Sequence, residues 1–276
     1  MIQLIGIDVD GTLLDSTGRM PRANRAAIHA AVAAGIHVVL VTGRSYPFAR
    51  PVADELPDSV SLIVSNGAVE RRKDGRHLAR RLLSRSRARS VLESTRAHRA
   101  SSALVFDRDH AEQVVFETMD WEHPGRKGYY LRNRHLIARA VPLEDALTED
   151  PIQVMFSGGV DHMREVADAV RQEAGDVTVL LTEYVHRDFS LLDITDASAT
   201  KGRALAWRAA QLGLSAADVM AVGDNLNDVD MLEFAGTPVV MGNAVDGLRS
   251  RGWHLTTHND DAGLARAIER FALGRG

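Results

Sequence analysis

The chain contains no cysteine, which excludes disulfides, thiolate catalysis and cysteine-ligated zinc. It also lacks long hydrophobic runs. The apolar stretches are only as long as strands, so none is expected to span a bilayer. The first of them, Leu4–Ile7, ends at Asp8 and is too short for a signal peptide. Together these absences predict a cytoplasmic protein with no membrane partner. The lack of cysteine fits the reducing cytoplasm, where proteins do not rely on disulfides for stability.

Lysine and net positive charge are scarce as well. Only three of the 33 basic residues are lysines, namely Lys73, Lys127 and Lys201. A lysine in a chain so dominated by arginine indicates a need for a compact ammonium group. The net charge is −4, which provides no basic field for nucleic acid, and none is expected as a partner. The basic run at residues 71–89 lacks interleaved aromatic residues and is expected to be a solvated face.

Hydrophobic residues make up 45% of the chain and charged residues 25%, which is typical of a globular protein. A length of 276 residues suits one large domain or two modest ones. Five short runs rich in β-branched residues predict parallel strands buried on both faces. These runs are Leu4–Ile7, Val38–Val41, Leu62–Val64, Val219–Val222 and Val239–Met241. Helices are expected at Ala23–Ala34, Gly202–Leu212 and Ala262–Leu273. The alternation predicts an α/β fold with a doubly wound parallel sheet and right-handed crossovers.

The middle of the chain has a different pattern. It predicts a helix at Ser86–Ala97 and a hairpin of Ala103–Phe106 with Gln113–Glu117. A strand at Ile152–Phe156, a helix at Asp161–Glu173 and strands at Val177–Thr182 and Phe189–Ile194 are expected to follow. Residues 84–194 are therefore expected to form an inserted α+β domain, between core segments 1–83 and 195–276.

Ligands bind beyond the carboxyl ends of the strands in an open parallel sheet. At these ends lie Asp8-Val9-Asp10-Gly11-Thr12, Thr42-Gly43-Arg44, Ser65-Asn66-Gly67 and the pair Asp224 and Asp228. Several carboxylates held together require a cation, and an oxygen-only ligand set selects a hard ion such as Mg²⁺. Lys201, at the start of the helix before the fourth predicted strand, adds an ammonium group suited to a phosphoryl oxygen.

Each motif taken singly has a simpler interpretation. An isolated Asp-x-Asp is usually a turn or a helix cap, and Asp224 with Asp228 can merely cap a helix. An isolated Lys201 is an ordinary surface lysine, and Arg44 can simply pair with a neighbouring carboxylate. The presence of all four motifs in order favours a site for metal and phosphate.

In this order the motifs resemble those of the haloacid dehalogenase-like hydrolase superfamily. The resemblance rests on Asp8–Thr12, Thr42-Gly43-Arg44, Lys201 and Gly223-Asp224-x-x-Asn227-Asp228. The position of the insert, Asn66-Gly67-Ala68 and Met241-Gly242-Asn243-Ala244 resemble the large-cap Cof-type branch. Only Val9 departs from the motif, where the branch commonly has leucine. The resemblance implies a Rossmann-like core and a cap that sets substrate specificity.

The resemblance also implies a role for each motif residue. Asp8 would attack phosphorus to form an aspartyl-phosphate, while Asp10 would act first as general acid and then as general base. Mg²⁺ would be held by the carboxylates of Asp8 and Asp224 and the backbone carbonyl of Asp10. The phosphoryl oxygens would be bound by Val9, Thr42, Gly43, Lys201 and Asn227. Supporting positions behind these ligands would be held by Asp228, Thr12 and Asn66.

These features predict a phosphoric monoester hydrolase that acts on small phosphorylated metabolites such as sugar phosphates. One alternative is a phosphomutase, which uses the same aspartyl-phosphate chemistry. The other is a non-catalytic protein that binds a phosphorylated metabolite, although such a binder would gain only repulsion from Asp8 and Asp10. The sequence predicts no oligomeric state.

Overall fold

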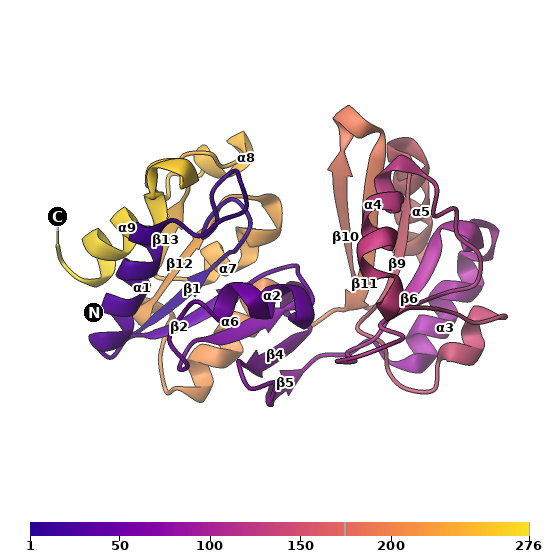
Figure 1. Cartoon of the computed structure of the whole chain (residues 1–276), viewed down its shortest axis with the longest axis horizontal. Coiled ribbons are helices and arrows are strands. Elements are labelled where there is room, and N and C mark those ends of the chain that lie inside the picture. The colour runs from indigo at the N-terminus through magenta and orange to yellow at the C-terminus, as the bar shows by residue number, and fades with distance from the viewer. Residues whose placement is uncertain (174, 276) are drawn as a thin grey trace. The chain divides into compact units, whose positions relative to one another are not determined.

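The computed structural model describes residues 1–173 and 175–275, which form two compact units. Met1–Arg80 and Thr200–Gly276 form the first, here called the core unit. Arg81–Ala199 form the second, here called the cap unit, which interrupts the chain of the first (Figure 1). None of the helices in the described part of the chain combines the length and the apolar character that a bilayer crossing demands.

The core unit is built on a sheet of eight strands in the order β14-β13-β12-β1-β2-β3-β4-β5. The five predicted strands are its parallel centre, β1 (Leu4–Ile7), β2 (His37–Val41), β3 (Ser61–Val64), β12 (Val219–Gly223) and β13 (Thr237–Val240). β14 (His254–Leu255) adds a parallel edge, and β4 (Val69–Arg72) with β5 (His77–Arg80) adds an antiparallel one. The expected α/β fold is confirmed, because the apolar runs are buried between two layers of helices.

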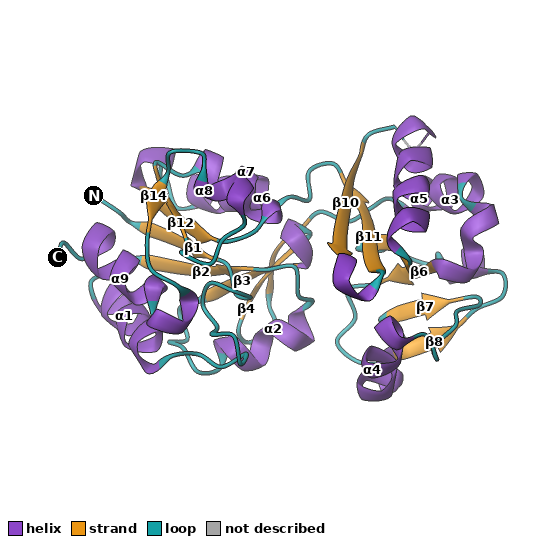
Figure 2. Cartoon of the chain, turned by 90° about the horizontal axis from the view of Figure 1, so that it is seen from above, coloured by secondary structure: helices purple, strands orange, loops and turns teal. Residues whose placement is uncertain are grey.

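Helices cover both faces of this sheet (Figure 2). α1 (Arg22–Ala33) and α9 (Gly263–Ala267) lie on one face, while α6 (Lys201–Gln211) and α7 (Val229–Phe234) lie on the other. α1 stops before Gly35, whose φ of +84° favours a residue without a Cβ atom. The predicted C-terminal helix is divided, since a π-helical turn at Ile268–Ala272 follows α9. Three helices of this unit were not expected, namely α2 (Tyr46–Ala53), α7 and α8 (Asp246–Arg249).

The cap unit contains a second, six-stranded sheet in the order β10-β11-β9-β6-β7-β8. Its strands are β6 (Ser102–Val105), β7 (Val114–Phe116), β8 (Ile137–Arg139), β9 (Gln153–Gly158), β10 (Val177–Tyr184) and β11 (Phe189–Asp196). The hairpin of β6 and β7 is confirmed as antiparallel. α3 (Arg85–Ser94) and α5 (Val160–Glu173) pack against this sheet, and α4 (Pro124–Asn133) was not expected. Phe156 and Leu192 are fully buried in the resulting core.

The expectation of a solvated basic face at residues 71–89 is wrong for its first residue. Arg71 lies in β4 with 1% of its surface exposed, and its guanidinium lies 4.6 Å from the centre of the Tyr46 ring. Lys73 also turns inward, where its ammonium donates to the carbonyl of Leu56 at 2.7 Å. A basic run in the sequence therefore contains one buried cation, Arg71, because strand alternation directs its side chain into the protein, while Lys73 in the following turn is partly buried.

Leu192 and Leu131 offer a matched test of the cap core. Leu192→Ala should lower the free energy of unfolding by about 2–5 kcal/mol, because it leaves a cavity beside Phe156. Leu131 is 60% exposed on α4, so Leu131→Ala should change that energy by less than about 0.5 kcal/mol. Urea denaturation followed by circular dichroism measures both. Equal losses in the two variants would contradict this packing.

Candidate active site

Asp8 directly follows β1, where the backbone turns sharply toward the loop after β12. Gly11 makes this turn with a φ of +83°, and a Cβ atom there would lie only 2.4 Å from Oδ2 of Asp224. The amides of Leu13 and Leu14 both donate to the carbonyl of Val9, at 3.1 and 3.0 Å, and close the turn. The glycine is therefore needed so that the loops that follow β1 and β12 can meet.

Lys201 is the charged centre of the site. It is the first residue of α6, whose N-cap Thr200 accepts a hydrogen bond from the amide of Arg203 at 3.2 Å. The Lys201 ammonium donates to Oδ1 of Asp8 and to Oδ1 of Asp228, each at 2.6 Å. The side chains of all three residues are at least nine-tenths buried. The compact ammonium expected from the scarcity of lysine thus lies between two carboxylates.

Burial strongly changes the proton affinity of these groups. It raises the pKa of Asp8, and the charges of Asp228 and Asp224 raise it further, against the opposing effect of Lys201. Burial and the charge of Asp228 also raise the pKa of Asp224, to about 6. Burial by itself would lower the pKa of Lys201, but the charges of Asp228 and Asp8 outweigh it and raise that pKa. The cluster therefore holds more negative than positive charge when its carboxylates are ionised.

This cluster fits a hard divalent cation. One oxygen from each of Asp8, Asp224 and Asp228 lies within 4.8 Å of the other two. Asp228 is already held by protein donors, since its Oδ2 accepts from the amides of Asp224 at 2.9 Å and Asn225 at 3.0 Å. The Asp224 carboxylate accepts a hydrogen bond from the hydroxyl of Thr12 at 3.0 Å. Because three carboxylates face one ammonium, a bound cation would relieve their repulsion, and oxygen ligands suit Mg²⁺.

Asp10 lies apart from this buried cluster. Its carboxylate accepts two hydrogen bonds from the guanidinium of Arg44, at 2.8 Å from Nε and 2.5 Å from Nη2. The Asp10 side chain is 61% exposed and that of Arg44 is 30% exposed. The open question of whether Arg44 pairs with a neighbouring carboxylate is therefore answered, and its partner is Asp10.

The remaining predicted site residues gather at the ends of β2 and β3. Thr42 is 1% exposed, and its carbonyl accepts from the amide of Asn66 at 3.0 Å. Asn66 takes a left-handed φ of 52°, and its side-chain oxygen accepts from Asn227 at 3.3 Å. A Cβ atom on Gly43 would lie 3.1 Å from that same oxygen. Segments distant in sequence thus meet at one edge of the sheet, as the strand order requires.

Two asparagines that were not predicted as site residues fasten the loop after β1. Asn243 donates to the carbonyl of Gly11 at 2.8 Å, and its side-chain oxygen accepts from the amide of Asn259 at 3.0 Å. The buried side chain of Asn259 donates to the carbonyl of Leu14 at 2.9 Å. Asn243 belongs to a motif that carried the resemblance, but no local pattern in the sequence marks Asn259.

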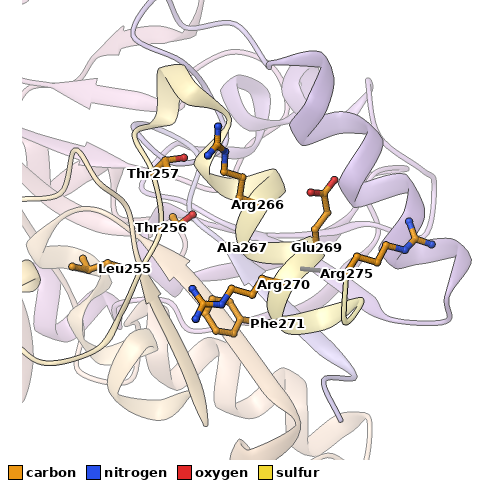
Figure 3. Close-up of a pocket in the computed structure, with 9 residues that line it drawn as sticks. All are labelled: Leu255, Thr256, Thr257, Arg266, Ala267, Glu269, Arg270, Phe271 and Arg275. Carbon is orange, nitrogen blue, oxygen red and sulfur yellow. The ribbon is translucent and has the colours of Figure 1, made fainter.

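A cavity of about 460 Å³ lies elsewhere in the core unit, between β14 and the C-terminal helical segment (Figure 3). None of the predicted site residues lines it. Three arginines do line it, Arg266, Arg270 and Arg275, but their guanidinium groups point in different directions. They therefore do not converge on one anion. The buried carboxylates that could take part in a reaction lie instead around Lys201.

Comparison with known proteins agrees with this geometry. A model of the haloacid dehalogenase-like hydrolase family matches residues 5–268. The chain belongs to this family. A structure of the phosphatase BT1666 from Bacteroides thetaiotaomicron is 25% identical, with a TM-score of 0.80 over 99% of this chain and 96% of that one. The structure of the subclass IIB sugar phosphatase BT4131 is 20% identical, with a TM-score of 0.77 over 98% and 99%, and this likeness shows the fold.

Curated relatives cover the whole length of the chain. The phosphatase YwpJ of Bacillus subtilis is 26% identical, over 98% of this chain and 100% of the relative. YcsE of the same organism, a 5-amino-6-(5-phospho-D-ribitylamino)uracil phosphatase, is 27% identical over 99% and 96%. The expected family and fold are confirmed, and the enzyme class that the comparisons support is the expected one, a phosphoric monoester hydrolase.

The raised pKa of Asp224 predicts how stability depends on pH. In the metal-free protein the folded state binds the Asp224 proton more tightly than the unfolded state, so stability falls as pH rises from about 4 to about 6. Asp224→Asn removes this penalty. At pH 7.5 with a chelator, the variant should be more stable than the wild type by on the order of 1–3 kcal/mol, whereas the two should agree below about pH 4.

Urea denaturation across this pH range, with and without Mg²⁺, measures the effect. Mg²⁺ should stabilise the wild type at pH 7.5 but not Asp224→Asn. Asp246→Asn, which changes an exposed carboxylate of α8, serves as the matched control and should follow the wild type. A metal-free Asp224→Asn that is less stable than the wild type at pH 7.5 would contradict the charge balance described above.

Proposed function

We propose that this hydrolase is a Mg²⁺-dependent phosphatase that removes phosphate from small phosphorylated metabolites, in particular sugar phosphates. The observation that carries the proposal is the buried Asp8–Lys201–Asp228 bridge beside Asp224. The relatives support the substrate class, because YcsE is named for a phosphorylated ribityl compound and BT4131 for sugar phosphates.

In this proposal Asp8 is the nucleophile. Lys201 holds one of its carboxylate oxygens at 2.6 Å, which fixes the orientation of the group. The other oxygen would attack phosphorus, so that a bond from Asp8 to phosphorus forms as the bond to the leaving alkoxide breaks. The Lys201 charge also offsets the repulsion between the carboxylate and the incoming phosphoryl group. An aspartyl-phosphate would result, and water would then hydrolyse it.

The carboxylates of Asp8 and Asp224, with the backbone carbonyl of Asp10, would hold Mg²⁺. Asp228, which bonds the Asp224 amide and Lys201, would support this set from behind. Bound Mg²⁺ supplies positive charge that neutralises the phosphoryl oxygens. Thr12, which donates to Asp224, fixes the orientation of that ligand.

The phosphoryl oxygens would be bound by short polar groups at the same sheet edge. Val9 and Gly43 would donate through backbone amides, and Thr42, Lys201 and Asn227 through side chains. Asn66, which accepts from Asn227, would fix its amide. Asp10 would protonate the leaving alkoxide and then take a proton from the attacking water.

Substrate choice is assigned in this proposal to the inserted domain, expected at residues 84–194. Exchange of its loops should change which phosphorylated metabolite is preferred, while leaving the chemistry at Asp8 intact. A screen of phosphorylated metabolites for phosphate release by the full chain would identify the substrate.

Asp8→Asn tests the covalent mechanism. With Mg²⁺ and p-nitrophenyl phosphate, kcat should fall by at least about 1,000-fold, because an amide is not a nucleophile. A chelator should abolish the wild-type activity, and Mg²⁺ should restore it. Asp246→Asn should keep wild-type activity, and circular dichroism should show that both variants fold. Turnover by Asp8→Asn at the wild-type rate would exclude Asp8 as nucleophile.

Phosphorus NMR of a reaction with a sugar phosphate distinguishes the alternatives. A phosphatase releases inorganic phosphate, whereas a phosphomutase forms an isomeric sugar phosphate. Saturable binding without turnover in the presence of Mg²⁺ would instead indicate a phosphometabolite-binding protein.

A further inference from the structure

Lys201 is the first residue of α6, and the first amides of a helix have no hydrogen-bond partner within it. We infer that Asp230 and Gly67 are positioning residues for Lys201, because they hold the two residues that flank it in the chain. This inference rests on the proposed function, in which the Lys201 ammonium binds a phosphoryl oxygen. Neither positioning residue belongs to the proposed nucleophile, metal ligands or phosphate ligands.

Asp230, in the first turn of α7, holds the residue that follows Lys201. Its Oδ2 accepts a hydrogen bond from the amide of Gly202 at 2.8 Å. The two backbones are also in contact, since a Cβ atom on Gly202 would lie only 2.4 Å from the carbonyl oxygen of Asp230. The Asp230 carboxylate therefore supplies an acceptor that α6 cannot supply itself, and its negative charge suits the N-terminus of a helix.

Gly67, in the turn after β3, holds the residue that precedes Lys201. A Cβ atom on Gly67 would lie 2.3 Å from the carbonyl oxygen of Thr200, far closer than van der Waals contact allows. Ser65, Asn66 and Gly67 take φ values of +51°, +52° and +102° in succession. Positive φ values at non-glycine residues persist only where the surroundings hold them, and they are common at functional sites.

The proposed chemistry requires a precise position for the Lys201 ammonium. It lies 2.6 Å from Oδ1 of Asp8 and 2.6 Å from Oδ1 of Asp228. A displacement of about 1 Å at a reacting centre can lower the rate about 100-fold. Because Thr200 and Gly202 are both held, the backbone of Lys201 is fixed at the end of a helix, where chains otherwise fray. Loss of either contact should therefore move the ammonium group.

The scarcity of lysine makes this displacement measurable without reference to activity. Selective ¹³C labelling of lysine gives NMR signals from only three residues, Lys73, Lys127 and Lys201. The Lys201 signal is assigned as the one that is absent from Lys201→Met. In the full chain, Gly67→Ala and Asp230→Ala should each shift or broaden the Lys201 signal while the other two stay in place.

Activity with p-nitrophenyl phosphate and saturating Mg²⁺ should follow the NMR signal. Gly67→Ala and Asp230→Ala should each lower kcat/KM about 10- to 100-fold. Asp230→Asn keeps a side-chain oxygen that can accept from the Gly202 amide. It should therefore restore most of kcat/KM and return the Lys201 signal to its wild-type position.

Two control variants make the same chemical changes away from Lys201. Gly35→Ala also adds a methyl group at a positive φ, +84°, but no atom lies within 4 Å of the new Cβ position. Asp218→Ala also removes a carboxylate that accepts from a backbone amide, that of Ser215 at 3.0 Å, but it lies before β12. Neither variant should change kcat/KM or the Lys201 signal.

Circular dichroism shows which variants fold, and if Gly67→Ala does not, Asp230→Ala and its rescue by Asp230→Asn decide. The inference is overturned if the folded variants keep the Lys201 signal at its wild-type position. It is also overturned if the signal moves while kcat/KM stays at the wild-type value. A wild-type enzyme that releases no phosphate would instead overturn the proposed function, and the NMR comparison would still test whether Gly67 and Asp230 position Lys201.

Discussion

A single buried ammonium group sustains the charge arrangement of the site. Lys201 bonds Asp8 and Asp228 at 2.6 Å each, in a place where all three side chains are almost completely removed from water. Two carboxylates without this cation would repel one another at low dielectric, and removal of one partner from such a pair costs about 3–5 kcal/mol. The start of α6, the end of β1 and the loop after β12 are thereby fixed together.

The same arrangement leaves the site short of positive charge. Lys201 balances part of the charge of Asp8, Asp224 and Asp228. Burial, and after it the charge of Asp228, raises the pKa of both Asp8 and Asp224. A bound divalent cation would offset the remaining negative charge, which links the electrostatics of the fold to the proposed reaction. The exposed Asp10 is outside this balance because Arg44 pairs with it.

Sequence reasoning located most of this edge of the sheet. The strands that carry Asp8 and Asp224 are buried on both faces, so their apolar runs were continuous and easily found. The rarity of lysine, together with its position before the fourth predicted strand, pointed to Lys201. Sequence reasoning could not find the partner of Arg44 or the hydrogen bond from Asn259 to Leu14, because each joins segments distant in sequence. It also could not find the burial of Arg71, which depends on the direction of a side chain near the edge of the sheet.

Direct capture of the phosphorylated enzyme tests the central claim. The full chain, mixed with p-nitrophenyl phosphate and Mg²⁺ and quenched in acid within the first turnovers, is digested and analysed by mass spectrometry. The account predicts one added phosphoryl group, labile to base as an acyl phosphate is, on the peptide that contains Asp8. A phosphoryl group on a different residue, or sustained phosphate release with no labelled peptide at any quench time, would contradict it.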